Sequence, residues 1–499
     1  MTVPQSPSAE QDRATRWVEI VTQEIASVLK ENLAAINLND PRNGEFASIE
    51  RSVQSLLRTV GGILATNWAH AAQDVLQGRP RCAPCARPMA LDRVRTLKKL
   101  SLVGTHTLTR PQYVCTRCGV RTDPADTLWK LGPGLLSPEL SRVVSAAGVE
   151  IPSFERAAAT VSETLGIHLA TRTVERTCEA LGAVAEAAIQ AEMTEVLARP
   201  GDAIKVPVGD GNGDDRPVQV ATPLPPDAPT LLVGADGARV FEDKDWREVK
   251  IGVVCELGPD RRHDSKTGRD PLVLGSRQYV AGVEDADTFF ARLTTRVDPA
   301  RDRARGPMRI LMIGDGGPWI WARSQYVAAP GDEVHEILDL FHAGEHLGEV
   351  AKAVHRDDKA AQAWAESWTE RLRDEGPQPV LDALQDLRPR GRSARDTVRK
   401  AIKYFEDNAS RMDYPAYAAR GWPLGSGIVE STCRLVSNLR IKEPGMRWSH
   451  GGVQDVLTLR ALRLSSLNIW QHFWSSAPQT LRPAVRTLTY AKEHAARAA

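Results

Sequence analysis

Apolar positions along the chain follow two different periods. In residues 15–77 they recur every three or four residues, which predicts two or three helices that serve in packing or dimerisation. The same period returns in residues 137–198, where we expect a helix, a turn at Gly166 and a second helix that Thr171 caps. Beyond a Gly-, Pro- and Asp-rich linker at 200–229, the apolar runs become short and continuous, which is typical of strands.

The second half of the chain predicts an alternation of strands and helices. Five strands are expected, in residues 231–237, 246–257, 271–282, 308–323 and 335–347, and the fourth breaks into a turn at Asp315 and then enters a helix. One amphipathic helix lies between the third and fourth strands, and another follows the fourth. Three strands, a helix, a strand, a helix and a strand is the order of the ribonuclease H core. The chain is therefore expected to be a multidomain α+β protein with an RNase H-like mixed sheet.

Composition narrows the class of protein. The chain has 64 Lys and Arg against 63 Asp and Glu, a net charge of +1, so any nucleic-acid site must be a local patch. No run approaches the ~18 apolar residues of a membrane helix. The N-terminal residues lack the basic and then apolar pattern of a secretory signal, so we expect a cytoplasmic, nucleoid-associated protein without membrane contact. The sequence has no glycine-rich loop that ends in Lys followed by Ser or Thr, the pattern that would predict an ATPase.

Four of the seven cysteines form two CxxC pairs, Cys82 with Cys85 and Cys115 with Cys118. Each pair can place two sulfurs on one side of an ion, and four thiolates suit tetrahedral Zn²⁺. The 29 residues between the pairs have the length of a short hairpin, so the spacing predicts a zinc ribbon. A redox pair or a chance spacing are the alternatives. Nine Lys and Arg residues accompany one acid in residues 81–121, which suggests contact with a phosphate backbone; a folding element with a solvated surface is the alternative for each of these charges.

The helical pair around Gly166 is similar to a helix-turn-helix. Arg172 and Arg176 would then face DNA from the second helix, and a plain helical hairpin is the alternative.

Three carboxylates fall at positions that could converge in the expected sheet. Asp236 lies at the first strand and Asp315 just past the fourth, and these strands are neighbours in the ribonuclease H order. Glu430 follows the glycine-rich turn "GWPLGSG" near the start of a helix. Oxygen ligands suit Mg²⁺ or Mn²⁺, and a two-ion site activates oxygens on phosphate. Each residue alone has a structural alternative, namely an Asp-Gly turn or an acid near a helix N-terminus capped by Ser426.

These motifs together resemble the DDE transposases of bacterial insertion sequences, nearest to the ISKra-type group. The resemblance rests on "ADG", "WREVKIGVV", "GDGGPWIW", "LDLFHAGEHL" and above all "GSGIVESTCRLVSNLRIKEPGMRWS", and it covers roughly residues 80–465. It implies a metal-dependent DNA transposase that binds the terminal inverted repeats of its element and catalyses strand cleavage and strand transfer. It assigns Asp236, Asp315 and Glu430 as metal ligands, and it implies an all-helical insertion between Asp315 and Glu430.

The resemblance also points to residues that would contact DNA. Asp339 and His342 match a motif that follows the fifth strand in mutator-like transposases, and a structural hydrogen bond is the alternative role. After Glu430 come the basic residues Arg434, Arg440, Lys442 and Arg447, which are candidate phosphate contacts, and Trp448, which could stack on a base or anchor the packing.

Six segments are expected. They are a helical region at 1–78, a zinc ribbon at 79–128, a helix-turn-helix region at 129–200, the first part of the core at 201–350, the helical insertion at 351–415, and the last part of the core with C-terminal helices at 416–499. The expected partners are double-stranded DNA, as transposon ends and target, and a second copy of the chain. Two other classes remain open, a transposase-derived DNA-binding or regulatory protein without catalysis and an RNase H-like nuclease.

Overall fold

The computed structural model describes residues 7–34, 45–73, 76, 78–131, 134–198, 223–258, 274–449 and 451–476. The chain divides into one unit of Met1–Leu181 with Phe473–Ala499 and a second unit of Gly182–His472. This division is coarser than the six expected segments. Most of the linker expected at 200–229 and the C-terminal residues after 476 lie outside the described residues. Both units mix helices and strands, as a multidomain α+β protein requires. None of the described helices combines the length and hydropathy needed to cross a bilayer.

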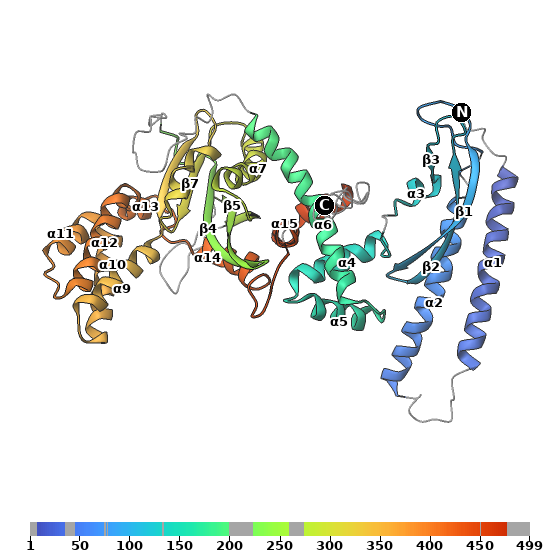
Figure 1. Ribbon diagram of the computed structural model, residues 1–499, viewed down its shortest axis with the longest axis horizontal. Coiled ribbons are helices and arrows are strands. Elements are labelled where there is room, and N and C mark those ends of the chain that lie inside the picture. Colours follow the sequence, from blue (N-terminus) through green and yellow to red (C-terminus); the bar gives the residue numbers. More distant parts are fainter. Residues whose placement is uncertain are drawn as a thin grey trace, which may run out of the picture. The chain divides into compact units, whose positions relative to one another are not determined.

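Two long helices begin the first unit, α1 (Pro7–Ala34) and α2 (Phe46–Gln73), and they lie side by side (Figure 1). The period of three to four residues predicted them. Their packing includes an edge-to-face contact of Trp17 with Trp68, whose ring centroids are 6.3 Å apart.

A small antiparallel sheet follows, with strands β1 (Ala90–Ser101), β2 (Gly104–Val114) and β3 (Arg121–Thr122) in that order. The β1–β2 turn has only two residues, and Gly104 follows it with a positive φ of 118°. This hairpin occupies the spacer between the two CxxC pairs, as the sequence predicted.

Four helices come next, α3 (Pro124–Trp129), α4 (Pro138–Glu150), α5 (Phe154–Leu165) and α6 (Thr171–Leu197). Helix α5 begins at Ser153, whose hydroxyl accepts from the Arg156 N–H at 3.1 Å, and it ends at Gly166 with a φ of 59°. Ala157, Ala158 and Val174 are fully or almost fully buried between these helices. The pair α5–α6 and the turn at Gly166 therefore follow the order expected from the sequence, but α6 begins at Thr171 and the Thr173 and Val174 N–H groups donate to the Ala170 carbonyl, so Thr171 is not its cap.

The second unit is built on a five-stranded sheet with the strand order β6-β5-β4-β7-β8 (Figure 1). The strands are β4 (Thr230–Glu242), β5 (Asp245–Leu257), β6 (Leu274–Gly282), β7 (Arg309–Gly314) and β8 (Glu333–Leu338). Strands β4, β5 and β6 pair antiparallel, whereas β4–β7 and β7–β8 pair parallel. Helix α7 (Ala286–Ala304) connects β6 to β7, and α8 (Pro318–Trp321) with the 3₁₀ turn η2 (Ser324–Val327) lies between β7 and β8.

The fifth strand is shorter than predicted. Residues 335–347 were expected to be strand throughout, but β8 ends at Leu338 and helix α9 (Leu340–Val354) begins directly afterwards. Asp339 causes the change, because its carboxylate caps α9 by accepting from the Phe341 N–H at 2.9 Å. The apolar run across the junction fits a strand and a helix equally well, so its composition did not reveal the boundary.

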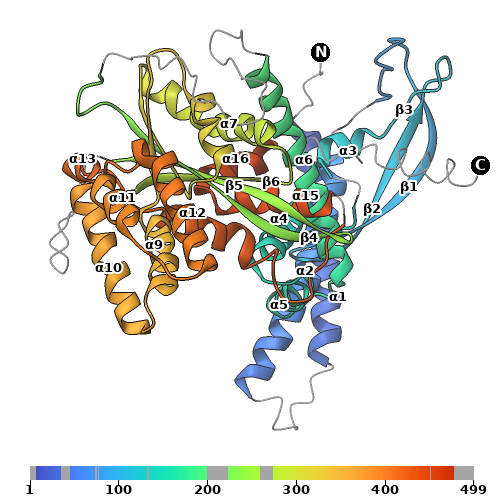
Figure 2. The same cartoon turned by 60° about the vertical axis from the view of Figure 1, so that its left-hand side comes forward.

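Residues 351–415 are helical, as expected. They hold the end of α9, α10 (Asp358–Glu375), α11 (Pro377–Asp386), α12 (Arg392–Asn408), the turn η3 (Ala409–Arg411) and the start of α13 (Tyr414–Ala419). Helix α9 packs against both α10 and α12 (Figure 2). The chain then returns to the sheet with α14 (Gly427–Cys433), the π-helical turn η4 (Arg434–Asn438), α15 (Gly452–Leu464) and α16 (Leu467–Ser476).

Helix α15 and the second part of α6 pack closely within this unit. A Cβ added at Gly182 would lie 2.1 Å from the Asp455 carbonyl oxygen, so only glycine permits this backbone approach.

Candidate metal centre and carboxylate site

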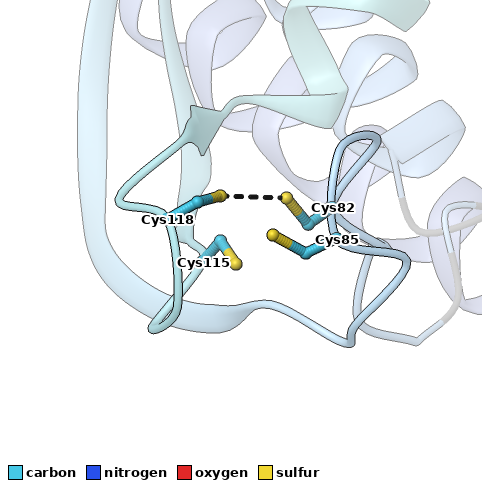
Figure 3. A group of neighbouring side chains, drawn as sticks. All are labelled: Cys82, Cys85, Cys115 and Cys118. Carbon is cyan, nitrogen blue, oxygen red and sulfur yellow. Dashed lines mark hydrogen bonds between the residues drawn. The ribbon is translucent and has the colours of Figure 1, made fainter.

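The four cysteines of the CxxC pairs come together at one end of the small sheet. Their sulfurs lie within 4.8 Å of one another and point towards a common centre (Figure 3). The two turns match, because the Ala86 N–H donates to the Cys82 carbonyl at 2.7 Å and the Gly119 N–H donates to the Cys115 carbonyl at 2.9 Å. Ala86 and Gly119 each have a positive φ, 53° and 74°. Two equivalent turns thus each present a pair of sulfurs.

The thiol cluster suits a tetrahedral metal. Zn–S bonds of about 2.3 Å imply sulfurs about 3.8 Å apart, and Cys82 Sγ lies 3.4 Å from Cys118 Sγ. All four thiols are free, so the structure has no disulfide here. Backbone N–H groups of Cys118 and Arg117 hydrogen-bond the Cys115 sulfur and lower its pKa to about 6, which favours the thiolate at this one residue. Burial raises the pKa of Cys82, and the hydrogen bond with Cys118 raises the pKa of Cys85 to about 12. Among the described residues this is the one group of three or more His, Cys, Asp or Glu placed to hold a metal such as zinc.

Asp236 and Asp315 lie at matching levels of neighbouring parallel strands. The pairing of β4 with β7 ends where Gly234 lies opposite Ile313. Asp236 and Asp315 each follow two residues later. Burial raises the pKa of Asp236, and the negative charge of Asp315 raises it further, while hydrogen bonds from Cys433 and Gly237 oppose the shift. The Asp315 carboxylate accepts from the Gly317 N–H at 3.0 Å, which orients it at the turn.

Helix α14 packs against the middle of β4, around Gly234, and carries Glu430. The contact depends on Gly234, because a Cβ added there would lie 2.3 Å from Cγ2 of Val429. Glu430 is exposed, and an open cavity of about 680 Å³ is lined by both Asp236 and Glu430. Arg239, Arg434 and Lys442 line the same cavity, so three cationic residues accompany the two carboxylates there.

Cys433, which the sequence left unassigned, also lines the cavity. Its thiol donates to Asp236 Oδ2 across 3.1 Å, and only 7% of the residue is exposed. Burial and the neighbouring Asp236 charge raise the pKa of this thiol, which therefore stays protonated as a donor. Its position three residues after Glu430, on the same helix, was the signal available in the sequence.

The structure does not bring the three predicted carboxylates together at one point. The three do not form a group placed to hold one ion, unlike the cysteines. Carboxylate oxygens are the ligands that Mg²⁺ or Mn²⁺ prefers. In this structure Asp236 lies near Asp315 and lines a cavity with Glu430, but Asp315 does not line that cavity.

Asp339 has the structural role that was the alternative for it. Besides capping α9, its carboxylate accepts a hydrogen bond from the Ser426 hydroxyl, and only 7% of the residue is exposed. Ser426 precedes α14 without capping it through its side chain, so the expected Ser426 cap is wrong. His342 is partly exposed, and its Nδ1 lies 3.2 Å from Glu345 Oε2.

The structure separates the basic candidates into exposed and buried residues. Arg172 and Arg176 are exposed at the start of α6, and Arg434, Lys442 and Arg447 are exposed in the second unit. Arg440 is different, because only 1% of it is exposed and its guanidinium lies over the Trp448 ring, 5.3 Å from the centroid. In this position it cannot reach a phosphate, so the expectation for Arg440 is corrected to a packing role.

Trp448 is likewise 8% exposed, and its indole N–H donates to the Ile441 carbonyl at 3.0 Å. It is a packing anchor in this arrangement and has no free ring face on which a base could stack.

No protein-family model matches the chain, and a search of curated proteins finds no match. Function is therefore inferred from the residues themselves and from their arrangement.

Proposed function

We propose that the chain is a DDE transposase that binds the ends of its insertion sequence and cleaves and joins DNA strands with the help of divalent metal ions. The observation that carries the proposal is that Asp236, in the middle of β4, lies near Asp315, directly after β7, and lines one cavity with Glu430. Three antiparallel strands followed by two parallel ones, in the order 3-2-1-4-5, support an RNase H-like core.

The residues of the proposed site have different roles, in metal binding, in phosphate binding and in orienting a ligand. Asp236, Asp315 and Glu430 would hold Mg²⁺ or Mn²⁺, which when bound supplies an activated oxygen nucleophile and stabilises the leaving oxygen. Arg434 and Lys442 line the cavity of Glu430 and would neutralise phosphate charge there. Cys433 holds one oxygen of Asp236 and fixes the orientation of its carboxylate.

The proposed end-binding residues lie on other elements. Arg172 and Arg176 are exposed at the start of α6, directly after the turn at Gly166, and could enter a major groove. The ribbon carries nine Lys and Arg residues against one acid in residues 81–121, which suits backbone contact. Exposed apolar side chains along α2, among them Phe46, Leu57 and Trp68, support the proposed homodimer, which sedimentation velocity would detect as twice the chain mass.

Strand cleavage of a labelled duplex that contains the DNA flanking the gene tests the proposal. Asp236→Asn, Asp315→Asn and Glu430→Gln should each reduce cleavage by orders of magnitude, because each removes a charge from a shared site. Gel shifts should show that the variants still bind the duplex. Glu443→Gln is the matched control, since this carboxylate belongs to the same segment but does not line the cavity.

The outcomes separate the candidate functions. Cleavage at the wild-type rate by any of the three variants would remove that residue from the site. Binding without cleavage by the wild-type chain would favour the DNA-binding protein, and cleavage without strand joining would favour the nuclease. Mn²⁺ binding, followed by electron paramagnetic resonance, should weaken in the Asp236→Asn variant independently of any cleavage.

A further inference from the structure

The segment 388–403, in the helical part of the second unit, carries a local excess of positive charge. It contains one acid, Asp396, and seven basic residues, which are Arg388, Arg390, Arg392, Arg395, Arg399, Lys400 and Lys403. All seven are exposed. The segment is thus +6, from seven minus one, while the whole chain is +1, so the remaining residues sum to −5. Average composition does not account for this concentration of charge.

Helix α12 arranges much of this charge along one face. Ala394, Val398, Ala401 and Phe405 are buried on one side of the helix. Arg392, Arg395, Arg399 and Lys403 follow each other at intervals of three or four residues and therefore form a stripe on the opposite side. At about 1.5 Å per residue the stripe is roughly 16 Å long. An open cavity of about 660 Å³ is lined by Arg392, Ser393, Arg395, Asp396 and Arg399.

The positive charge of the stripe is only partly compensated. Asp396 pairs with Arg399 and, at 3.2 Å, with Lys400, and Asp407 pairs with Lys403 at 3.0 Å. Within the part of the chain that the structure describes, Arg392 and Arg395 make no ion pair with an acid. Helix α10 differs, since its Arg371 and Arg373 pair with Glu375 and Asp374 at 3.0 and 2.6 Å. A helix that only needed a solvated surface could have paired its arginines in the same way.

We propose that segment 388–403 is a DNA-binding surface, separate from the cavity of Asp236 and Glu430, that holds the backbone of a DNA duplex. A stretch of duplex as long as the stripe carries about nine phosphate charges, and guanidinium groups bind phosphate oxygens through paired hydrogen bonds. The segment has no aromatic residue on which an unpaired base could stack, which favours a duplex over a single strand.

This binding function is separate from the proposed cleavage, because it requires neither a metal nor strand transfer. In a transposase it would grip DNA outside the recognised end, either flanking or target DNA. The DNA-binding assignment and the proposed catalytic function can therefore fail separately.

The test measures binding of the full chain to a random-sequence duplex by fluorescence anisotropy over a range of KCl concentrations. The triple variant Arg392→Gln, Arg395→Gln, Arg399→Gln should bind at least tenfold more weakly at low salt. The slope of log affinity against log salt should become less steep by about 0.9 for each lost phosphate contact, or about 2.7 in total. A second triple variant with Lys at the same three positions keeps the charge and should retain most of the slope.

The matched control removes three charges from α10, with Lys359→Gln, Arg371→Gln and Arg373→Gln, and should bind as the wild type does. Circular dichroism and thermal unfolding check that each variant is folded. An unchanged salt slope in the first triple variant, or an equal loss in the α10 variant, would overturn the proposal. Competition by polyglutamate as strong as by duplex DNA would assign the surface to an acidic protein instead. The anisotropy assay contains no divalent metal and measures no cleavage, so a failure of the cleavage test does not decide this one.

Discussion

A buried arginine connects four segments of the second unit and allows a quantitative prediction. Only 1% of the Arg292 side chain, on α7, is exposed. Its guanidinium donates to both oxygens of Glu186 on α6, at 2.9 and 2.7 Å, and to both oxygens of Glu284 after β6, at 2.7 and 2.8 Å. The Thr458 hydroxyl on α15 adds a hydrogen bond to Glu186 at 2.6 Å. Replacing Glu186 by Gln therefore removes one charge from a closed, satisfied network.

The expected cost follows from the pKa of Glu186. Burial raises this pKa, but the hydrogen bonds and the charge of Arg292 outweigh burial and lower it from 4.5 to about 2. A shift of about 2.5 units at ~1.36 kcal/mol per unit corresponds to about 3 kcal/mol of stability. Because the folded pKa is the lower one, this contribution is complete above the unfolded value of 4.5 and is lost as the pH falls from 4.5 towards 2.

Urea unfolding of wild type and Glu186→Gln near neutral pH and near pH ~3 measures the effect. The variant should be less stable by about 3 kcal/mol at neutral pH, and the difference should shrink in acid. Glu256→Gln is the control, because this carboxylate of the second unit is 43% exposed and its partner Arg303 is 55% exposed. Such an exposed pair contributes at most about 1 kcal/mol. A Glu186→Gln difference that is equal at both pH values would refute the reasoning.

Two further predictions concern the metal centre and the position of α14. Metal analysis should find about one zinc ion per chain, lost in Cys115→Ser but kept in Cys255→Ala, whose thiol belongs to the other unit; a zinc-free wild type grown with ample metal would contradict this. Gly234→Ala should destabilise the unit by about 1–3 kcal/mol and reduce DNA cleavage, because its new methyl group displaces Val429 and with it Glu430. Gly427 lies on α14 with Val429 and Glu430, and a Cβ added there would have no atom within 4 Å. Gly427→Ala is therefore the control in both the unfolding and the cleavage assays.

Local signals in the sequence predicted much of the fold. The CxxC pairs and the hairpin between them depend on short-range turn geometry, and α1 and α2 depend on a regular apolar period. The first four strands of the second unit were also recognisable from short apolar runs, but β4 continues five residues beyond the expected 231–237, to Glu242. The fifth failed in part, because an aspartate that ends an apolar run can equally close a strand or cap a helix. Only the contacts of Asp339 with Phe341 and Ser426 distinguish the two.

The candidate site was less predictable, because its details depend on contacts between distant residues. Cys433 and Asp236 are 197 residues apart, yet they share a hydrogen bond. Gly234 is needed because the Val429 side chain of α14 packs directly against it, and no local sequence pattern indicates this close contact. The order of elements predicted that Asp236, Asp315 and Glu430 would be neighbours, but distances between carboxylate oxygens depend on side-chain packing that no pattern encodes.

The arginines of the second unit show why charge in a sequence must be interpreted through burial. Arg292 and Arg440 are each only 1% exposed, and each is held by groups that packing supplies, two glutamates for Arg292 and an indole ring for Arg440. A buried guanidinium needs such partners, since an unpaired charge in the interior costs several kcal/mol. Arg392 and Arg395 have neither burial nor an acidic partner among the described residues, so folding does not require their charge. Charge that folding does not require is available for binding, so segment 388–403 can bind an anionic partner whereas Arg440 cannot.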